Sequence, residues 1–238
     1  MALTDRKVMT FDVVGTLIDF ETGILDYVQA RAKAAGVALA DRAILEAYAV
    51  AEDRQHHQTP RLPFPSMMAP MYHEMADVLG LPDSNADAEE FRLSIPYWPA
   101  FGDSVAALKR LKRRFHLVAM TNSDDWALSH FARTLDNPFD DLVTAEMVGW
   151  NKPDPQVFAF TRGRLSTKGF VFGDILHVAQ SQYHDIAVAR RLGYHTCWVE
   201  RRKGKQGGGA TPTVQKVAIP DYHFGSLVEL ADAADAGK

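Results

Sequence analysis

An acidic residue, Asp12, stands inside the first apolar stretch of the chain, residues 8–14. The apolar run predicts a buried strand, and a buried strand tolerates an acid only when another group pairs with it or uses it. Gly15 permits a sharp turn directly after the strand, and the Thr16 hydroxyl can hydrogen-bond the carboxylate and fix its orientation. Asp12 is therefore a candidate for chemistry, with a structural role in the turn as an equal alternative.

Further polar groups stand where later strands end or helices begin. Thr121 and Asn122 follow an apolar run and precede a helical stretch, so they offer a hydroxyl and backbone N–H groups to an anion. Lys152 lies just before another predicted helix, and Asp185 lies where a strand gives way to a helix. The sequence thus supplies a hydroxyl, a cation and two carboxylates, which are residue types that nucleophilic and acid–base catalysis use.

Strands and helices alternate along most of the chain. Apolar runs predict buried strands at residues 8–14, 115–120, 170–173, 175–179 and 196–199. Apolar stripes at helical spacing predict helices over residues 103–113, 124–135, 154–165 and 184–192. Strands separated by helices indicate an α/β fold, in which a parallel sheet is covered on both faces.

Residues 22–95 break this alternation because they predict helices alone. The expected helices cover residues 22–35, 41–57, 66–79 and 86–94, and a proline-rich joint with Pro96 and Pro99 follows. We therefore expect an α/β core formed by residues 1–18 and 97–238, with residues 19–96 inserted as a helical cap. Such an insert would lie over the carboxyl ends of the strands, where open α/β sheets bind ligands.

The composition excludes several classes of protein. The chain has 238 residues, of which 47% are hydrophobic, and 26 basic against 30 acidic residues give a formal net charge of −4. The high apolar content argues against a disordered tail protein. The mildly acidic net charge argues against a nucleic-acid partner. The single cysteine, Cys197, cannot form an internal disulfide, so nothing indicates an oxidising compartment. The sequence has no apolar run of about 18 residues and no apolar signal core near the N-terminus. We therefore expect a cytoplasmic protein without a membrane span. The basic, glycine-rich residues 201–209 predict a mobile solvated loop.

Taken together, the polar motifs resemble those of the haloacid dehalogenase (HAD) superfamily over nearly the whole chain. The motifs are Asp-x-x-Gly-Thr-Leu from Asp12, Thr-Asn from Thr121, Lys-Pro-Asp-Pro-x-x-Phe from Lys152 and Gln-Ser-x-x-x-Asp from Gln180. The resemblance implies a Rossmann-like parallel sheet core, an inserted α-helical cap and Asp12 as a covalent nucleophile.

Two departures from the superfamily pattern indicate the branch. Phosphatases of the superfamily carry a general acid two residues after the nucleophile, where this chain has Val14, which cannot exchange a proton. They also carry an aspartate that binds Mg²⁺ where this chain has Gln180, and a neutral amide is a poor replacement for an anionic oxygen. The sequence therefore resembles the 2-haloacid dehalogenase branch, which implies a hydrolase without a metal or other cofactor.

Resemblance to that branch implies a role for each motif. Asp12 would displace halide from C2 of a small carboxylic acid and form an ester, Lys152 would be the adjacent cation, and Asp185 would be the base for the hydrolytic water. Thr16, Thr121 and the Asn122 backbone would position the nucleophile and hold the substrate carboxylate.

Other candidate binding residues come from the predicted cap and from the segment before Lys152. Arg54 and Arg61 stand at a polar helix end, and either could neutralise the substrate carboxylate or receive the halide, with a solvated helix end as the alternative. Trp150, Gln180 and the less polar Val14 are further candidates for the lining, and packing explains Trp150 equally well. His56 and His57 are adjacent and diverge on a helix, so we expect no metal site there.

The identity of the substrate stays open at this point. Dehalogenases usually have Tyr at the positions of Val14 and Phe158 and Ser at that of Gln180, which puts the leaving group in doubt. Hydrolytic C–N ring opening of azetidine-2-carboxylate is one alternative. A HAD phosphatase with an altered metal site and a non-catalytic HAD-fold binding protein are the others. The expected partner is a small-molecule carboxylate substrate, and a homodimer is possible because relatives often form one.

Overall fold

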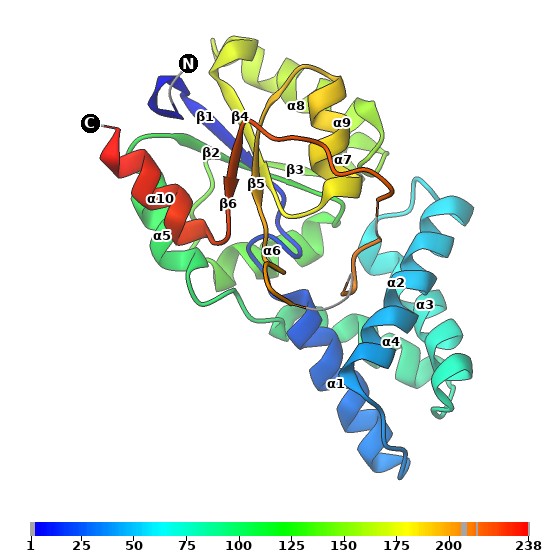
Figure 1. Cartoon of the computed structure of the whole chain (residues 1–238). Helices are drawn as coiled ribbons and strands as arrows, with labels where there is room; N and C mark the ends of the chain where they lie inside the picture. The colour runs from blue at the N-terminus through cyan, green and yellow to red at the C-terminus, as the bar shows by residue number, and fades with distance from the viewer. Residues whose placement is uncertain (1–2, 206–208, 213, 238) are drawn as a thin grey trace.

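A parallel β-sheet forms the centre of the computed structural model, which describes residues 3–205, 209–212 and 214–237 (Figure 1). Within these residues the sheet has six strands in the order β3-β2-β1-β4-β5-β6, and every neighbouring pair is parallel. The strands are β1 (Val8–Phe11), β2 (His116–Thr121), β3 (Asp141–Thr144), β4 (Ile175–Ala179), β5 (His195–Val199) and β6 (Tyr222–Phe224). The strand order reverses direction between β1 and β4, and open α/β sheets bind ligands at such a point.

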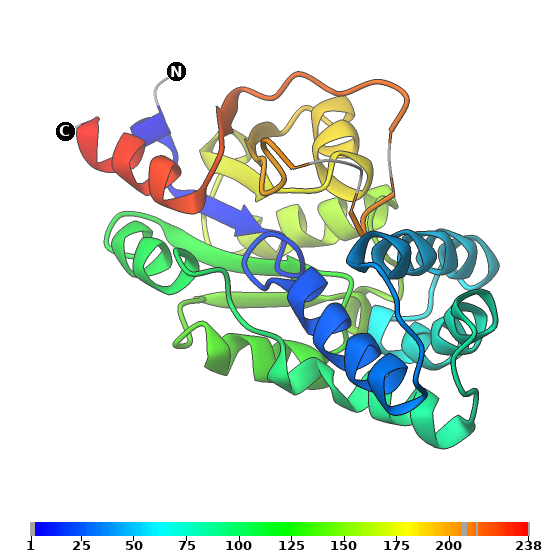
Figure 2. The same cartoon turned by 60° about the horizontal axis from the view of Figure 1, so that its bottom comes forward.

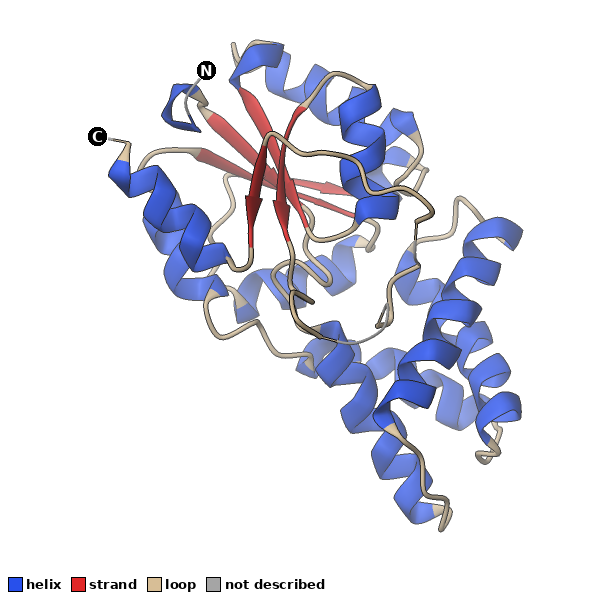
Figure 3. Cartoon of the chain, viewed as in Figure 1, coloured by secondary structure: helices blue, strands red, loops and turns tan. Residues whose placement is uncertain are grey.

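Helices cover both faces of the sheet (Figure 3). They are α5 (Ser104–Leu111), α6 (Asp125–Thr134), α7 (Ala145–Val148), α8 (Pro155–Ser166), α9 (Ala187–Arg191) and α10 (Leu227–Ala236). Side chains of β1 alternate between the two faces: Val8 packs in the cluster with α8 and α9, whereas Met9 and Phe11 pack in the cluster that includes α5, α6 and α10. This arrangement confirms the predicted α/β fold with a Rossmann-like sheet.

Four helices between β1 and α5 lie together beside the carboxyl ends of the strands (Figure 2). They are α1 (Phe20–Ala34), α2 (Asp41–Gln58), α3 (Phe64–Leu79) and α4 (Asn85–Leu93), and each matches a predicted helix within a few residues at its ends. The Asp19 side chain caps α1 by accepting a hydrogen bond from the Thr22 N–H at 3.3 Å. Gly80 follows α3 with a φ of 67°, a left-handed conformation that glycine adopts without strain. The predicted boundary of this cap at residues 19–96 stays a prediction.

The apolar stripe of α3 packs between the cap and the core. Met67, Met68, Met71 and Met75 are buried and belong to one apolar cluster, which also contains Met9 of β1. The cap and one face of the sheet therefore share a continuous core.

Several predicted elements differ from the structure. Residues 170–173 are not a strand, because Val171 is 63% exposed and a 3₁₀ turn, η3 (Phe172–Asp174), leads into β4. The sequence did not predict β3 or β6, which are short strands at the two edges of the sheet with partly exposed side chains. The predicted helix over residues 184–192 is a π-turn, η4 (Gln182–Ile186), followed by α9. Two further 3₁₀ turns are η1 (Leu3–Asp5) and η2 (Ile95–Tyr97).

The predicted solvated loop over residues 201–209 is only partly described, since residues 206–208 lie outside the described residues. Its beginning is not solvated. The Arg201 guanidinium bonds both carboxylate oxygens of Asp103, at 2.8 and 3.0 Å, and its side chain is 8% exposed. Among the described residues, no helix is long and apolar enough to cross a membrane.

Candidate active site

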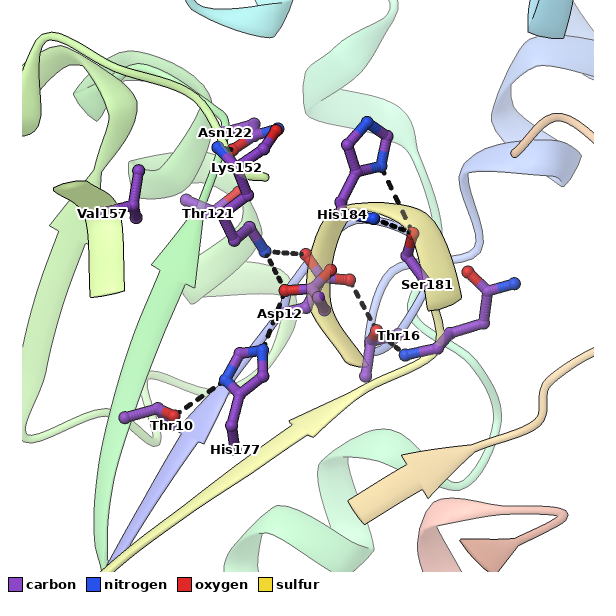
Figure 4. A network of polar contacts seen from close by, with 12 residues as sticks. Thr10, Asp12, Thr16, Thr121, Asn122, Lys152, Val157, His177, Ser181 and His184 are labelled. Atoms are coloured by element: carbon purple, nitrogen blue, oxygen red, sulfur yellow. Dashed lines mark hydrogen bonds and ion pairs between the residues drawn. The ribbon is translucent and has the colours of Figure 1, made fainter. Parts of the chain in front are cut away.

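Asp12 lies directly beyond β1, at the point where the strand order reverses, and is 7% exposed. Its Oδ2 accepts a hydrogen bond from Thr16 Oγ1 at 2.6 Å (Figure 4). The turn that returns Thr16 to the carboxylate passes through Gly15, whose φ is 86°. Thr16 Oγ1 in turn accepts a hydrogen bond from the Gln180 N–H at 2.8 Å, which ties this turn to the segment after β4.

Lys152 joins the two carboxylates of the motifs. Its Nζ donates to Asp12 Oδ1 at 2.8 Å and to Asp185 Oδ1 at 2.7 Å, and the residue is 1% exposed (Figure 4). The Asn122 side chain holds the Lys152 backbone from both sides, with bonds of 2.9 Å to its carbonyl and 2.7 Å from its N–H. The segments after β1 and β4 therefore meet the loop before α8 at one ammonium group, and the end of β2 holds the backbone of that loop.

His177, which the sequence analysis did not single out, supports Asp185 from the strand below. Its Nε2 lies 2.9 Å from Asp185 Oδ1, and its Nδ1 lies 2.9 Å from Thr10 Oγ1. Thr10 and His177 are register partners on β1 and β4, so the pairing of these strands sets the ring in place (Figure 4). The other oxygen, Asp185 Oδ2, is buried and has no hydrogen-bond partner among the described residues.

The two carboxylates have different pKa values because His177 supports only Asp185, whereas the charge on Asp185 acts against Asp12. Burial raises the pKa of Asp12, the charge on Asp185 raises it further, and Lys152 and Thr16 oppose this rise. Burial also favours a raised pKa for Asp185, but the charge on Lys152 and the bond to His177 outweigh it and hold the pKa of Asp185 at about 2. Asp185 is thus the more firmly ionised carboxylate of the two.

A small cavity of about 50 Å³ lies between these groups and the cap. The core side chains around it come from the ends of β1, β2 and β4 and from the loop before α8, while Glu52 and His56 of α2 and Phe64 of α3 cover it from the cap. The predicted site residues that line it are Asp12, Val14, Thr121, Asn122, Lys152, Gln180 and Asp185. Most of the predicted site residues therefore lie around one cavity. Thr16 does not line it but holds the Asp12 carboxylate by a hydrogen bond.

The candidate cap arginines, Arg54 and Arg61, do not line this cavity. Arg54 lies on the other side of α2, where its Nη1 bonds Glu74 at 3.0 Å. The Arg61 guanidinium stacks on Trp150, 4.8 Å from the ring centroid. Trp150 lines a neighbouring pocket of about 270 Å³ instead.

Two histidines that line the cavity, His56 and His184, carry no charge at neutral pH. Burial lowers the pKa of His56 to about 4 and that of His184 to about 3, and the ring centroids lie 5.0 Å apart. His184 is 8% exposed, and its backbone N–H donates to Ser181 Oγ at 2.9 Å. The Phe158 ring packs edge-on against the His177 ring, with the ring centroids 5.4 Å apart, and Phe158 does not line the cavity.

The residues present do not fit the Mg²⁺ ion that phosphatases of this fold use. The Lys152 ammonium already lies between the two carboxylates that would share a metal ion, and Gln180 offers only a neutral amide. Among the described residues, no group of three or more His, Cys, Asp or Glu side chains is placed to hold a metal ion.

Comparison with known proteins identifies the family of this chain. The model of the haloacid dehalogenase-like hydrolase family matches residues 6–193. The chain belongs to this family. A haloacid dehalogenase-like hydrolase domain-containing protein 3 of Mus musculus is 26% identical over 96% of this chain and 94% of its own length.

Two similar proteins of the family are named as 2-haloacid dehalogenases. The (S)-2-haloacid dehalogenase of Pseudomonas putida is 27% identical, over 44% of this chain and 45% of its own length. The L-2-haloacid dehalogenase of Xanthobacter autotrophicus superposes with a TM-score of 0.80 over 98% of this chain and 100% of its own, at 15% identity. This second similarity establishes the fold of this HAD-like hydrolase.

Proposed function

We propose that this HAD-like hydrolase removes the halogen from a small 2-haloacid through an ester on Asp12. The observation that carries the proposal is the single ammonium of Lys152 held between two buried carboxylates beneath a small cavity. The similarity to the Pseudomonas putida enzyme supports halide as the leaving group.

In the first step, an Asp12 carboxylate oxygen attacks C2 and the halide departs with the bonding electron pair. Both oxygens of Asp12 accept hydrogen bonds, one from Thr16 and one from Lys152, so the carboxylate is oriented before substrate arrives. Val14 lies two residues further on and lines the cavity with an apolar surface. Thr121 and the Asn122 backbone, at the end of β2, are the groups we assign to the substrate carboxylate.

In the second step, water attacks the carbonyl carbon of the Asp12 ester and releases a 2-hydroxy acid. Asp185 is ionised, lines the same cavity and has a buried oxygen, Oδ2, without a partner among the described residues. That oxygen can accept a proton from the attacking water, and His177 and Lys152 hold the other oxygen in place. The ester carbonyl forms next to Lys152, whose charge stabilises the oxyanion that develops there.

A screen of small 2-substituted acids tests the proposal. We expect halide release from chloroacetate, fluoroacetate or 2-chloropropionate, none from D12N, and at most one equivalent from D185N, which keeps the nucleophile but lacks the base. Azetidine-2-carboxylate and an aryl phosphate with Mg²⁺ represent the competing reactions. Turnover of the phosphate alone, or ring opening without any halide release, would contradict the proposal.

A further inference from the structure

The Glu52 carboxyl is a titratable group of the cavity that the proposed mechanism leaves unused. Glu52 and His56 lie one helical turn apart on α2, and both line the cavity that holds Asp12. Arg54, between them in sequence, faces away and bonds Glu74. The cap therefore places an acid, Glu52, opposite Asp12. An anionic substrate would lead one to expect a cation at this position instead.

Glu52 has no hydrogen-bond or ion-pair partner among the described residues. Lys152 neutralises the two carboxylates of the core, at 2.8 and 2.7 Å, and no bond from it reaches Glu52. Burial, the charge on Asp53 and the charge on Asp12 raise the pKa of Glu52 to about 8. The titratable or charged groups that face it are Asp12, Lys152 and Asp185 of the core, Tyr183 and His184 of η4, and Tyr48, Asp53 and His56 of α2.

These groups leave Glu52 as an uncharged acid at neutral pH. The neighbouring His56 and His184 are also neutral there, so neither can draw the proton from Glu52 as an ion-pair partner. An uncharged carboxylic acid has one O–H donor, and in a small cavity that donor points at whatever the cavity holds. Asp12 approaches C2 from the core, so a displaced group departs on the cap side, where Glu52 lies.

We propose that Glu52 donates a hydrogen bond to the leaving atom on C2, and that the preferred substrates are therefore 2-fluoroacids. This inference rests on the proposed ester mechanism. Fluoride is the strongest hydrogen-bond acceptor and the poorest leaving group among the halides, so it gains most from a donor. Bromide departs readily without one.

The step balances with water as the only co-reactant. The Asp12 oxygen forms a bond to C2 while the C2–F bond breaks, and its electron pair goes to fluorine, which departs as fluoride hydrogen-bonded to the Glu52 O–H. Water then cleaves the ester, and the proton that this hydrolysis releases passes through Asp185 to solvent. The net products are a 2-hydroxy acid, fluoride and one proton, while Asp12 regains its starting form and Glu52 keeps its proton throughout.

The test compares fluoride release from 2-fluoropropionate with bromide release from 2-bromopropionate between pH 5 and 10. For E52L we expect kcat/KM to fall about 100-fold with the fluoroacid, the usual cost of removing one preorganised hydrogen-bond donor from developing charge, and by no more than about threefold with the bromoacid. For E52Q, which keeps an N–H donor, we expect fluoride release within about tenfold of the native rate. E46Q, an exposed acid on the same helix, is the matched control and should match the native enzyme.

The pH profile gives a second readout. Fluoride release by the native enzyme should decline as pH rises through about 8, because Glu52 loses its proton there. Bromide release, and fluoride release by E52Q, should lack that decline. Equal losses with both halides in E52L, or unchanged fluoride release, would overturn the role of Glu52 alone. A native enzyme that releases neither halide would instead contradict the proposed function.

Discussion

Lys152 is the residue on which the charge balance of the site depends. Its ammonium compensates two carboxylates that are themselves buried, and its contacts with Asp12 and Asp185 are both shorter than 3 Å. Without it, two like charges would face each other in a cavity, and one carboxylate would take up a proton. Asp12 is that carboxylate, because Asp185 keeps the His177 ring beside it without Lys152, whereas Asp12 keeps only the Thr16 hydroxyl.

The variant K152M should therefore lose activity through protonation of the nucleophile. We expect kcat to fall about 1000-fold at pH 7, as expected for loss of a preorganised charge at a reacting centre. K112M, which removes an exposed lysine paired with Asp140, is the control and should be fully active. A K152M variant that turns over normally would show that Lys152 has only a structural role.

Among the secondary-structure elements, the strand ends were the most predictable. Asp12, Thr121 and Asp185 each follow an apolar run, and the carboxyl ends of parallel strands meet at one edge of a sheet. The edge strands β3 and β6 escaped prediction because strands of four and three residues are too short to give an alternating pattern.

Two side chains of the site were not singled out from the sequence. His177 stands in an apolar strand, and only the π-turn after β4 brings Asp185 back onto its ring. Glu52 lies four residues after Tyr48 and seven after Leu45, so helical spacing places it beside the apolar face of α2, whereas Arg54 falls off that face. This spacing is the signal from which Glu52 could have been predicted. For His177, the available signal was a histidine inside an apolar strand.

The contact between α1 and the joint after the cap gives a prediction about stability. Gly23 of α1 packs so closely on the Trp98 ring that a Cβ at this position would overlap the indole. We expect G23A to lower the free energy of unfolding by about 1–3 kcal/mol, since overpacking forces the neighbours to shift. G163A is the matched substitution on an exposed face of α8, with open space around it, and should raise stability by about 0.5–1 kcal/mol.

Urea unfolding of both alanine variants measures these changes. Equal effects at the two positions would mean that α1 does not pack on Trp98 as described.

In the whole molecule, the cap and the core are held together around the site. The Phe64 N–H of α3 donates to the Asn122 carbonyl at 2.9 Å, and the Asn151 side chain donates to the Leu62 carbonyl at 2.6 Å. These bonds tie the beginning of α3 to the two loops that carry Asn122 and Lys152. A cap substitution that breaks them should therefore disturb the position of Lys152 as well.

The charge arrangement of the whole site predicts activity without a metal ion. Lys152 takes the place between the carboxylates, and Val14 and Gln180 replace the acids that a magnesium phosphatase uses. Halide release should be unchanged after exhaustive treatment with EDTA, and added Mg²⁺ should not increase it. Activity that is lost with the chelator and restored by Mg²⁺ would contradict the assignment of Lys152 as the shared cation.

The central claim, an ester on Asp12, is tested most directly by isotope transfer over many turnovers in ¹⁸O-water. Because water attacks the ester carbonyl, the account predicts that ¹⁸O enters the Asp12 carboxylate, detected by the mass of the peptide that contains it. In a single turnover with excess enzyme, the oxygen in the 2-hydroxy acid should come from Asp12 and be unlabelled. A labelled product with an unlabelled Asp12 would mean that water attacks C2 directly, and the ester mechanism would be wrong.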